Sequence, residues 1–146
     1  MRPVVRSRTI SCDVERVWAV VSQPDHLPRW WPALARVEEA TPTAWTKVLQ
    51  TSGGRPVRAD FTRTAYEYER RLAWRQELEG SPFDRIFKSA ATEIVLEPEG
   101  PQATRVELRA LEELQGRFKL GGFLVRRAAR RRLDEALVGL ERALIG

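Results

Sequence analysis

The feature that most constrains the fold is a leucine stripe near the C-terminal end of the sequence. Four leucines recur at intervals of three or four residues, and two alanines lie beside them: Leu133, Leu137, Leu140, Leu144, Ala129 and Ala136. Such spacing places them on one face of an α-helix, predicted from about Phe118 to Ile145. The pair Gly121 and Gly122 is expected to weaken or bend its start. The rest of the chain must therefore supply an apolar surface for this stripe to cover.

That surface is predicted to be an antiparallel sheet. Between Ala33 and Glu113, turn signals at 40–43, 52–56, 80–82 and 97–102 separate segments of alternating apolar and polar residues. The pattern indicates six strands. Residues of one parity are apolar and those of the other parity are mostly charged, so one sheet face is expected to be buried. The apolar positions are Val57, Ala59, Phe61, Ala65, Leu72, Trp74, Leu78, Val106, Leu108 and Ala110.

The N-terminal segment adds one strand and one short helix. Residues 3–10 alternate as a strand does, and the helix that follows places Val14, Val17, Trp18 and Val21 on one face. Ser11 or Asp13 is expected to cap this helix, and Pro24 lies beyond its end. The proline-punctuated segment 25–34 has room for at most one further helical turn.

Composition excludes several classes of protein. A chain of 146 residues with 42% hydrophobic residues fits a single domain, residues 1–146, with a real core. The single cysteine, Cys12, and the single histidine, His26, exclude an internal disulfide and a Cys/His zinc site, and we expect no metal and no cofactor. The apolar runs are too short for a membrane helix and the first ten residues do not resemble a signal peptide, so a cytoplasmic protein is expected.

Short motifs resemble a known family. The Val17-Trp18 pair in the first helix, Trp30 followed by Pro32, and a turn at Gly100 leading into Thr104–Val106 resemble the polyketide cyclase/dehydrase type of the START and Bet v 1-like superfamily. Cys12 and Asp13 stand where many members have Ala-Pro, which affects only how the helix starts. The resemblance implies an α+β helix-grip fold, in which a curved antiparallel sheet of about seven strands wraps around the C-terminal helix.

The resemblance also implies an apolar cavity between sheet and helix, which family members use for lipids, polyketides, hormones or quinones. Residue parity and position nominate its lining, although plain core packing would produce the same aromatic pattern. Arg63 and Gln76 share the face of Phe61 and Trp74, and burial of either group requires a partner, which a polar ligand group would supply. The alternative is that both reach water at strand ends. The candidate binding residues are Trp30, Trp45, Phe61, Arg63, Trp74, Gln76, Phe83, Phe87 and Arg126.

Arg126 is a candidate because it lies seven residues before Leu133 and eleven before Leu137, on the buried stripe. At the cavity mouth its guanidinium would hold a carboxylate or a phosphate. The alternative, which we favour, is that the side chain extends past the edge of the core to water.

Three functions are compatible with these features. The first is binding of a small, largely apolar ligand with one polar or anionic group. The second is a cofactor-independent aromatase, cyclase or dehydratase, in which groups such as Arg63, Gln76, Tyr66 or Ser7 orient carbonyls. The chain has a single histidine, His26, and histidine is the residue type whose ordinary pKa lies near neutral pH; this scarcity argues against catalysis.

The third function is a basic adaptor for RNA or an anionic membrane. Residues 117–132 carry seven basic side chains and no acidic one, within a chain of net charge +5. We favour a solvated helix face for this run, because Arg130–Asp134 and Arg131–Glu135 have the spacing of helical ion pairs and no aromatic residues are interleaved among the arginines of residues 126–132. We therefore expect a small apolar molecule as the partner and no nucleic acid. Peripheral membrane contact and the choice between monomer and homodimer stay open.

Overall fold

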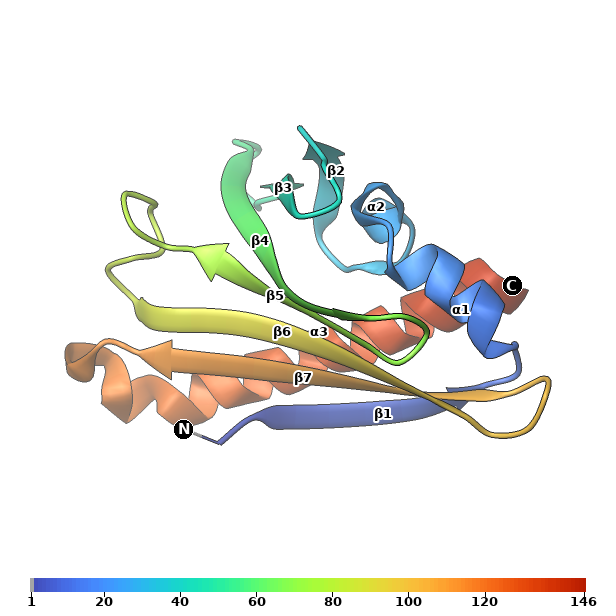
Figure 1. Cartoon of the computed structure of the whole chain (residues 1–146). Helices are drawn as coiled ribbons and strands as arrows, with labels where there is room; N and C mark the ends of the chain where they lie inside the picture. Colours follow the sequence, from blue (N-terminus) through green and yellow to red (C-terminus); the bar gives the residue numbers. More distant parts are fainter. Residues whose placement is uncertain (1) are drawn as a thin grey trace.

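A computed structural model describes residues 2–146, apart from the side chain of Lys119. Seven strands form one antiparallel sheet in the order β1-β7-β6-β5-β4-β3-β2, and the long helix α3 packs on β1 and β7 (Figure 1). The strands are β1 (Val4–Ile10), β2 (Leu34–Glu38), β3 (Ala44–Leu49), β4 (Val57–Glu67), β5 (Arg71–Glu77), β6 (Phe87–Pro98) and β7 (Thr104–Leu114). The helices are α1 (Val14–Val21), α2 (Leu27–Trp30) and α3 (Gly122–Ile145), with 3₁₀ turns at Pro24–His26 and Gly116–Gly121. This confirms the predicted α+β helix-grip fold.

The local signals for the first helix act as the sequence predicts. Asp13 is the N-cap residue of α1, and its carboxylate accepts a hydrogen bond of 3.1 Å from the backbone N–H of Arg16. Val17, Trp18 and Val21 are buried against the sheet and helix core. The Pro24 turn and the single turn α2 then bring the chain to β2, on the sheet edge opposite β1 (Figure 1).

The C-terminal helix begins later than the sequence predicts. Residues 116–121 form a 3₁₀ helix, and α3 starts at Gly122 rather than near Phe118. The physical reason is that the two adjacent glycines disfavour the regular α-helix at this point. The leucine stripe is buried as expected, since Leu133, Leu137 and Leu140 are all at most 2% exposed.

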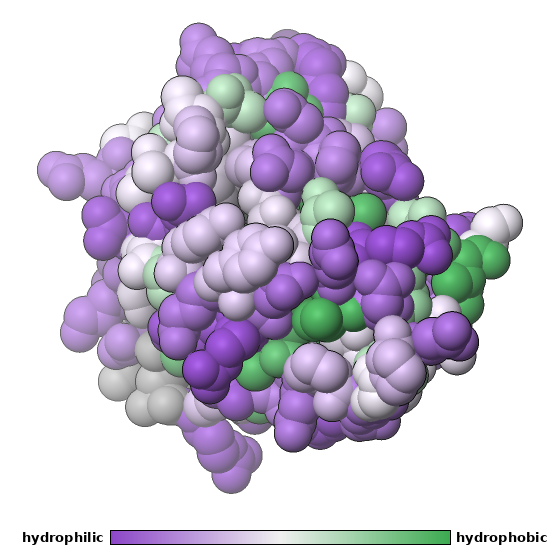
Figure 2. All heavy atoms as spheres, turned by 45° about the vertical axis from the view of Figure 1, so that its right-hand side comes forward, coloured by the Kyte–Doolittle hydropathy of each residue, from purple (hydrophilic) through white to green (hydrophobic). Residues whose placement is uncertain are grey.

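The core lies between the sheet and α3, and it continues under α1 and α2. Val106, Leu108 and Ala110 of β7 alternate with half-buried polar residues, which confirms the predicted apolar face of the sheet. Ion pairs Arg6–Asp134 and Arg8–Glu141 join β1 to α3 at the rim. The helical spacing predicts that Asp134 pairs with Arg130. In the structure Asp134 pairs with Arg6 instead. On the face shown in Figure 2, hydrophilic side chains dominate and hydrophobic ones form small patches.

Candidate functional site

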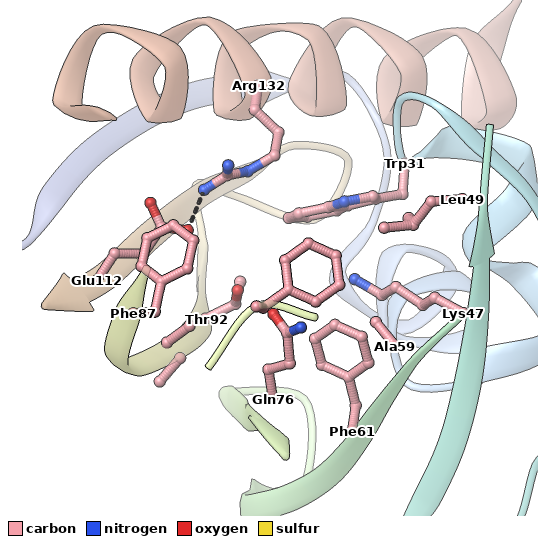
Figure 3. Close-up of a pocket in the computed structure, with 13 residues that line it drawn as sticks. Trp31, Lys47, Leu49, Ala59, Phe61, Gln76, Phe87, Thr92, Glu112 and Arg132 are labelled. Carbon is pink, nitrogen blue, oxygen red and sulfur yellow. Dashed lines mark hydrogen bonds and ion pairs between the residues drawn. The ribbon is translucent and has the colours of Figure 1, made fainter. Parts of the chain in front are cut away.

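A cavity of about 170 Å³ lies between the central strands and the middle of α3 (Figure 3). Strands β3 to β7 supply most of its wall, α3 supplies Arg132, and Trp31 closes one side just after α2. The lining is mainly apolar, with four residues that carry charged or amide groups. The full set is Trp31, Lys47, Leu49, Ala59, Phe61, Gln76, Phe83, Phe87, Ala90, Ala91, Thr92, Glu112 and Arg132.

Lys47 reaches the cavity because of its place in β3. Trp45 and Lys47 lie two residues apart and face the same side of the sheet, opposite Phe61 and Ala59 of β4. The methyl group of Ala59 is small, so it leaves space beside the long lysine side chain. Lys47 is only 3% exposed, which is rare for a lysine.

The surroundings of the Lys47 amine are aromatic rather than acidic. Its Nζ atom lies 4.5 Å from the ring centroid of Trp31, 4.3 Å from that of Phe61 and 5.2 Å from that of Trp74. Among residues 2–146, no carboxylate lies within ion-pair distance of this amine. The amine therefore faces the cavity without a counter-ion from the described residues.

Burial decides the charge state of Lys47. Loss of hydration lowers the pKa of its ammonium to about 7, and the positive charge of Arg132 adds to this shift. Burying an ion costs several kcal/mol, whereas a cation–π contact returns about 0.5–2 kcal/mol, so the rings offset only part of the cost. Near neutral pH the cavity therefore contains an amine that is present in both its protonated and its neutral form.

An ion pair lies on the side of the cavity nearer α3 and β7, and an amide group faces the same space from β5. Arg132 donates a hydrogen bond of 2.9 Å from Nη2 to Glu112 Oε2, and this ion pair bridges helix and sheet (Figure 3). The buried Nε2 atom of Gln76 has no hydrogen-bond partner among the described residues. An amide donor and the amine of Lys47 thus both point into the same space, while the charge of Arg132 is already balanced.

The cavity has a deep end and a shallower side. Trp31, Lys47 and Ala59 are buried, whereas Phe83 and Phe87 are half-buried. Phe83 belongs to the connection between β5 and β6, and Phe87 begins β6. The two phenylalanines therefore lie on the solvent side and the amine at the deep end.

Four residues named from the sequence line this cavity: Phe61, Gln76, Phe83 and Phe87. Two others stand immediately behind its wall. Trp45 stacks on Phe61 with ring centroids 6.4 Å apart and planes inclined by 9°, and Trp74 contacts Trp45, Trp31 and the Lys47 amine. Residue parity thus placed Phe61 and Gln76 on the sheet face that borders this cavity.

The structure places three other nominated residues elsewhere. Trp30 is buried beside Trp31 and does not line the cavity. Arg63 lies over the ring of Tyr66, with its guanidinium carbon 4.3 Å from the centroid. Arg126 donates a hydrogen bond of 2.7 Å to the backbone carbonyl of Arg2, at the N-terminal end of α3.

Tyr66 and Ser7, considered for an enzymatic role, also lie outside the cavity lining. Tyr66 is exposed beside Trp18, and the Ser7 hydroxyl accepts a hydrogen bond from Arg105 on the sheet edge.

Sequence reasoning missed Trp31, Lys47, Glu112 and Arg132. A signal existed for two of them. Lys47 has the same strand parity as Trp45, and Arg132 lies four residues before the buried Ala136. Helical spacing favours Arg126 instead, but this residue lies nearer the N-terminal end of α3, where it binds the Arg2 carbonyl.

The basic run 117–132 does not act as one surface. Arg132 points into the cavity wall, Arg126 binds the Arg2 carbonyl, and Arg131 pairs with Glu135 at 3.1 Å. Arg127 and Arg130 are exposed, and the side chain of Lys119 lies outside the described part. Of the six arginines in the run, Arg117, Arg127 and Arg130 are exposed and have no acidic partner among the described residues.

Two further results concern other site types. Within the described residues, no cluster of three or more His, Cys, Asp or Glu side chains is arranged to hold a metal ion. None of the helices described for residues 2–146 combines the length and the apolar character that crossing a membrane requires.

The fold matches that of several solved structures. The aromatase/cyclase di-domain BexL from the BE-7585A biosynthetic pathway is 19% identical with a TM-score of 0.81, over 98% of this chain and 46% of that one. A protein from Thermus thermophilus is 22% identical with a TM-score of 0.78, over 99% and 97% of the two chains. A START superfamily protein from Mycobacterium smegmatis is 14% identical with a TM-score of 0.76, over 97% and 96%.

At the level of sequence, no curated protein matches the chain significantly. The sequence profile of the family described as "Polyketide cyclase / dehydrase and lipid transport" matches residues 1–144. This match covers all seven strands and nearly all of α3. The chain therefore belongs to the polyketide cyclase/dehydrase and lipid transport family.

Proposed function

We propose that the protein binds a small, largely apolar molecule with one polar or anionic group in the cavity between the sheet and α3. The observation that carries this proposal is the buried amine of Lys47, which faces an apolar cavity without a counter-ion among the described residues. The family and the similar structures support the same class of function at a coarser level.

The shape and polarity of the cavity suit one ring and one polar substituent. A cavity of about 150 Å³ in another protein holds benzene, so about 170 Å³ accommodates a ring of that size. Phe61, Phe83 and Phe87 would contact its faces and edges. Lys47 and Gln76 would donate hydrogen bonds to an oxygen on the ring substituent.

Charge balance favours an acceptor group on the ligand. Glu112 balances the charge of Arg132, so Lys47 in its protonated form carries the surplus positive charge at the deep end. Water molecules would accept hydrogen bonds from the amine and the Gln76 amide, but the apolar wall would then stay in contact with water. A ligand with one oxygen and an apolar body would satisfy both kinds of surface, because its oxygen accepts from both donors and its apolar body covers the wall.

A titration by NMR tests this proposal. Benzyl alcohol and benzoate are added separately to the ¹⁵N-labelled protein, and the backbone and indole resonances are followed. We expect concentration-dependent shifts at Trp31, Lys47, Phe61 and Gln76, with much smaller shifts in β1. Shifts spread evenly over the surface, or none at millimolar concentrations, would contradict the proposal.

Ala59→Leu provides the matched variant. Ala59 lines the cavity beside Lys47, so the larger side chain occupies part of the ligand space and should weaken binding of both probes. Ala35→Leu makes the same change at an exposed position of β2 and should leave binding unchanged. Equal affinities of the two variants would place the binding site elsewhere.

The second candidate function is an enzyme of the aromatase, cyclase or dehydratase type. One observation favours it: Lys47 is a group in the cavity with a pKa of about 7, which suits general acid or base chemistry on a ketone. Exchange of the methyl protons of acetophenone in D₂O would measure such chemistry. Exchange above the buffer rate that is lost in Lys47→Met supports this function, and an unchanged rate contradicts it.

A further inference from the structure

The Lys47 side chain has the surroundings of a reactive amine rather than of a structural one. Structural lysines extend to water or pair with acids, and the exposed Lys88 beside Glu113 is such a case in this chain. Lys47 is 3% exposed, is surrounded by Trp31, Phe61 and Trp74, and has no acidic partner among the described residues. The charged group that acts on its pKa is another cation, Arg132.

Two features of this environment favour nucleophilic attack. Only a neutral amine has a lone pair to donate, and burial near a cation raises the neutral fraction at neutral pH. In addition, burial leaves the amine little contact with solvent, and the apolar wall of the cavity would hold an organic ligand against it. Lysines that form Schiff bases in enzymes are activated in this way.

A second donor lies across the same space. Figure 3 shows the Lys47 amine and the Gln76 amide pointing toward the middle of the cavity. The Gln76 Nε2 atom is buried and lacks a hydrogen-bond partner among the described residues. A carbonyl oxygen placed there would accept from Gln76 while its carbon faced the Lys47 nitrogen, which is the arrangement that addition to a carbonyl requires.

We propose that Lys47 is a covalent binding site for aldehydes and ketones with a small apolar body, which it captures as an imine. The inference rests on the proposed function and specifies the polar group of the ligand as a carbonyl. The nitrogen lone pair of the neutral amine forms a C–N bond to the carbonyl carbon, and the oxygen takes up the proton that the nitrogen loses. The resulting carbinolamine expels its hydroxyl group with a second proton from the nitrogen as one water molecule, leaving a C=N bond. No oxidant or reductant takes part, and hydrolysis reverses the step.

Reductive trapping tests the proposal on the unmodified chain. The protein is incubated at pH 7 with benzaldehyde and cyanoborohydride, which reduces the imine to a stable benzylamine, and the modified residues are identified by peptide mass spectrometry. The chain has only three lysines, Lys47, Lys88 and Lys119, so the assignment is simple. We expect Lys47 to be labelled at least about tenfold faster than Lys88, because an ordinary lysine is almost wholly protonated at this pH.

The pH profile and a competitor give independent readouts. The labelling rate of Lys47 relative to that of Lys88 should be greatest near neutral pH and should decline at higher pH, because the neutral fraction of Lys47 saturates above its pKa of about 7 whereas that of an ordinary lysine still rises. Benzyl alcohol, which has no carbonyl group, should slow the labelling of Lys47 and leave that of Lys88 unchanged. Lys47→Met should remove the fast labelling, and Lys88→Met is the matched control that should retain it.

The outcomes separate this inference from the proposed function. Equal labelling of Lys47 and Lys88 would overturn the covalent site. If benzyl alcohol still shifts the cavity resonances in that case, the cavity binds ligands and only the covalent step is wrong. If neither labelling nor shifts occur, both proposals are overturned. The comparison of two lysines within the wild-type chain does not depend on any variant folding.

Discussion

Lys47 is the residue on which the energetics of the cavity most depend. Its folded-state pKa of about 7 lies far below its ordinary value, chiefly because burial removes the hydration of the ammonium. The folded state therefore binds a proton less tightly than the unfolded chain. An apolar side chain of similar length would make the same contacts with Trp31 and Phe61 without this cost.

Lys47→Met is thus expected to stabilise the protein in a pH-dependent manner. Below a pH of about 7 Lys47 is protonated in both the folded and the unfolded wild type, so folding carries the full free-energy cost of burying the ammonium. Between that pH and about 10.4 only the unfolded chain binds it, so wild-type stability rises with pH by up to about 1.4 kcal/mol per unit relative to the variant. Urea unfolding across this pH range measures this difference. A stability difference that stays constant over this pH range would contradict the low pKa of Lys47.

Individual site residues differ in how well the sequence predicts them. Strand parity is fixed by the pleat, so Phe61 and Gln76 could be placed on the cavity side in advance. Arg63 keeps the parity of Phe61 and pairs with Trp74, but it lies further along β4, over the ring of Tyr66 and outside the cavity lining. Trp31, rather than Trp30, faces the cavity because α2 ends there and Trp31 takes an extended backbone conformation, which the sequence does not specify.

At the scale of elements, the close approach of α2 to α3 shapes the cavity wall. A Cβ atom added at Gly139 of α3 would overlap the carbonyl oxygen of Trp30 and lie 3.2 Å from its carbonyl carbon. Glycine at this position therefore lets the two helices touch and holds Trp31 over the cavity. The leucine stripe predicted that α3 is buried, but the contact at Gly139 depends on the position of α2, which only the fold defines.

Gly139→Ala is expected to destabilise the protein by about 1–3 kcal/mol, because the backbone of α2 must move to admit a methyl group. It should also weaken binding of the cavity probes, since Trp31 follows α2 directly. Thermal unfolding and the NMR titration measure the two effects. Gly122→Ala is the control: a Cβ there meets nothing within 4 Å, and stability should be unchanged or slightly higher. Equal stability of both variants would contradict the close approach.

At the scale of the whole molecule, ion pairs with carboxylates balance many of the basic side chains. The net charge is +5, yet ion pairs engage arginines on β1, on the sheet face and on α3. Sequence alone shows the basic run of residues 117–132, but it cannot show that Arg132 turns inward or that Arg126 binds a backbone carbonyl. Those contacts depend on where α3 meets the sheet.

Binding to nucleic acid is therefore expected to be weak and strongly dependent on salt. Three arginines of the run 117–132, Arg117, Arg127 and Arg130, are exposed without an acidic partner among the described residues and would release counter-ions on binding. Raising salt from about 50 to about 200 mM should therefore remove most of the affinity for a labelled DNA duplex. Replacing the exposed Arg127 and Arg130 with Gln should weaken it further and leave ligand binding intact. Fluorescence-anisotropy titrations of the labelled duplex measure the salt dependence of the affinity and the effect of the two substitutions. Tight, sequence-selective binding that persists at the higher salt concentration would instead favour the adaptor function.

The central claim is that the cavity beside Lys47 holds an apolar ligand by its one polar group. A crystal structure with 3-bromobenzyl alcohol tests this most directly, because the anomalous signal of bromine locates the ring independently of any assumed pose. The account predicts a bromine peak between the sheet and α3, with the hydroxyl within hydrogen-bond distance of Lys47 Nζ or Gln76 Nε2. Bromine found only on the outer surface, with the cavity occupied by water, would contradict it.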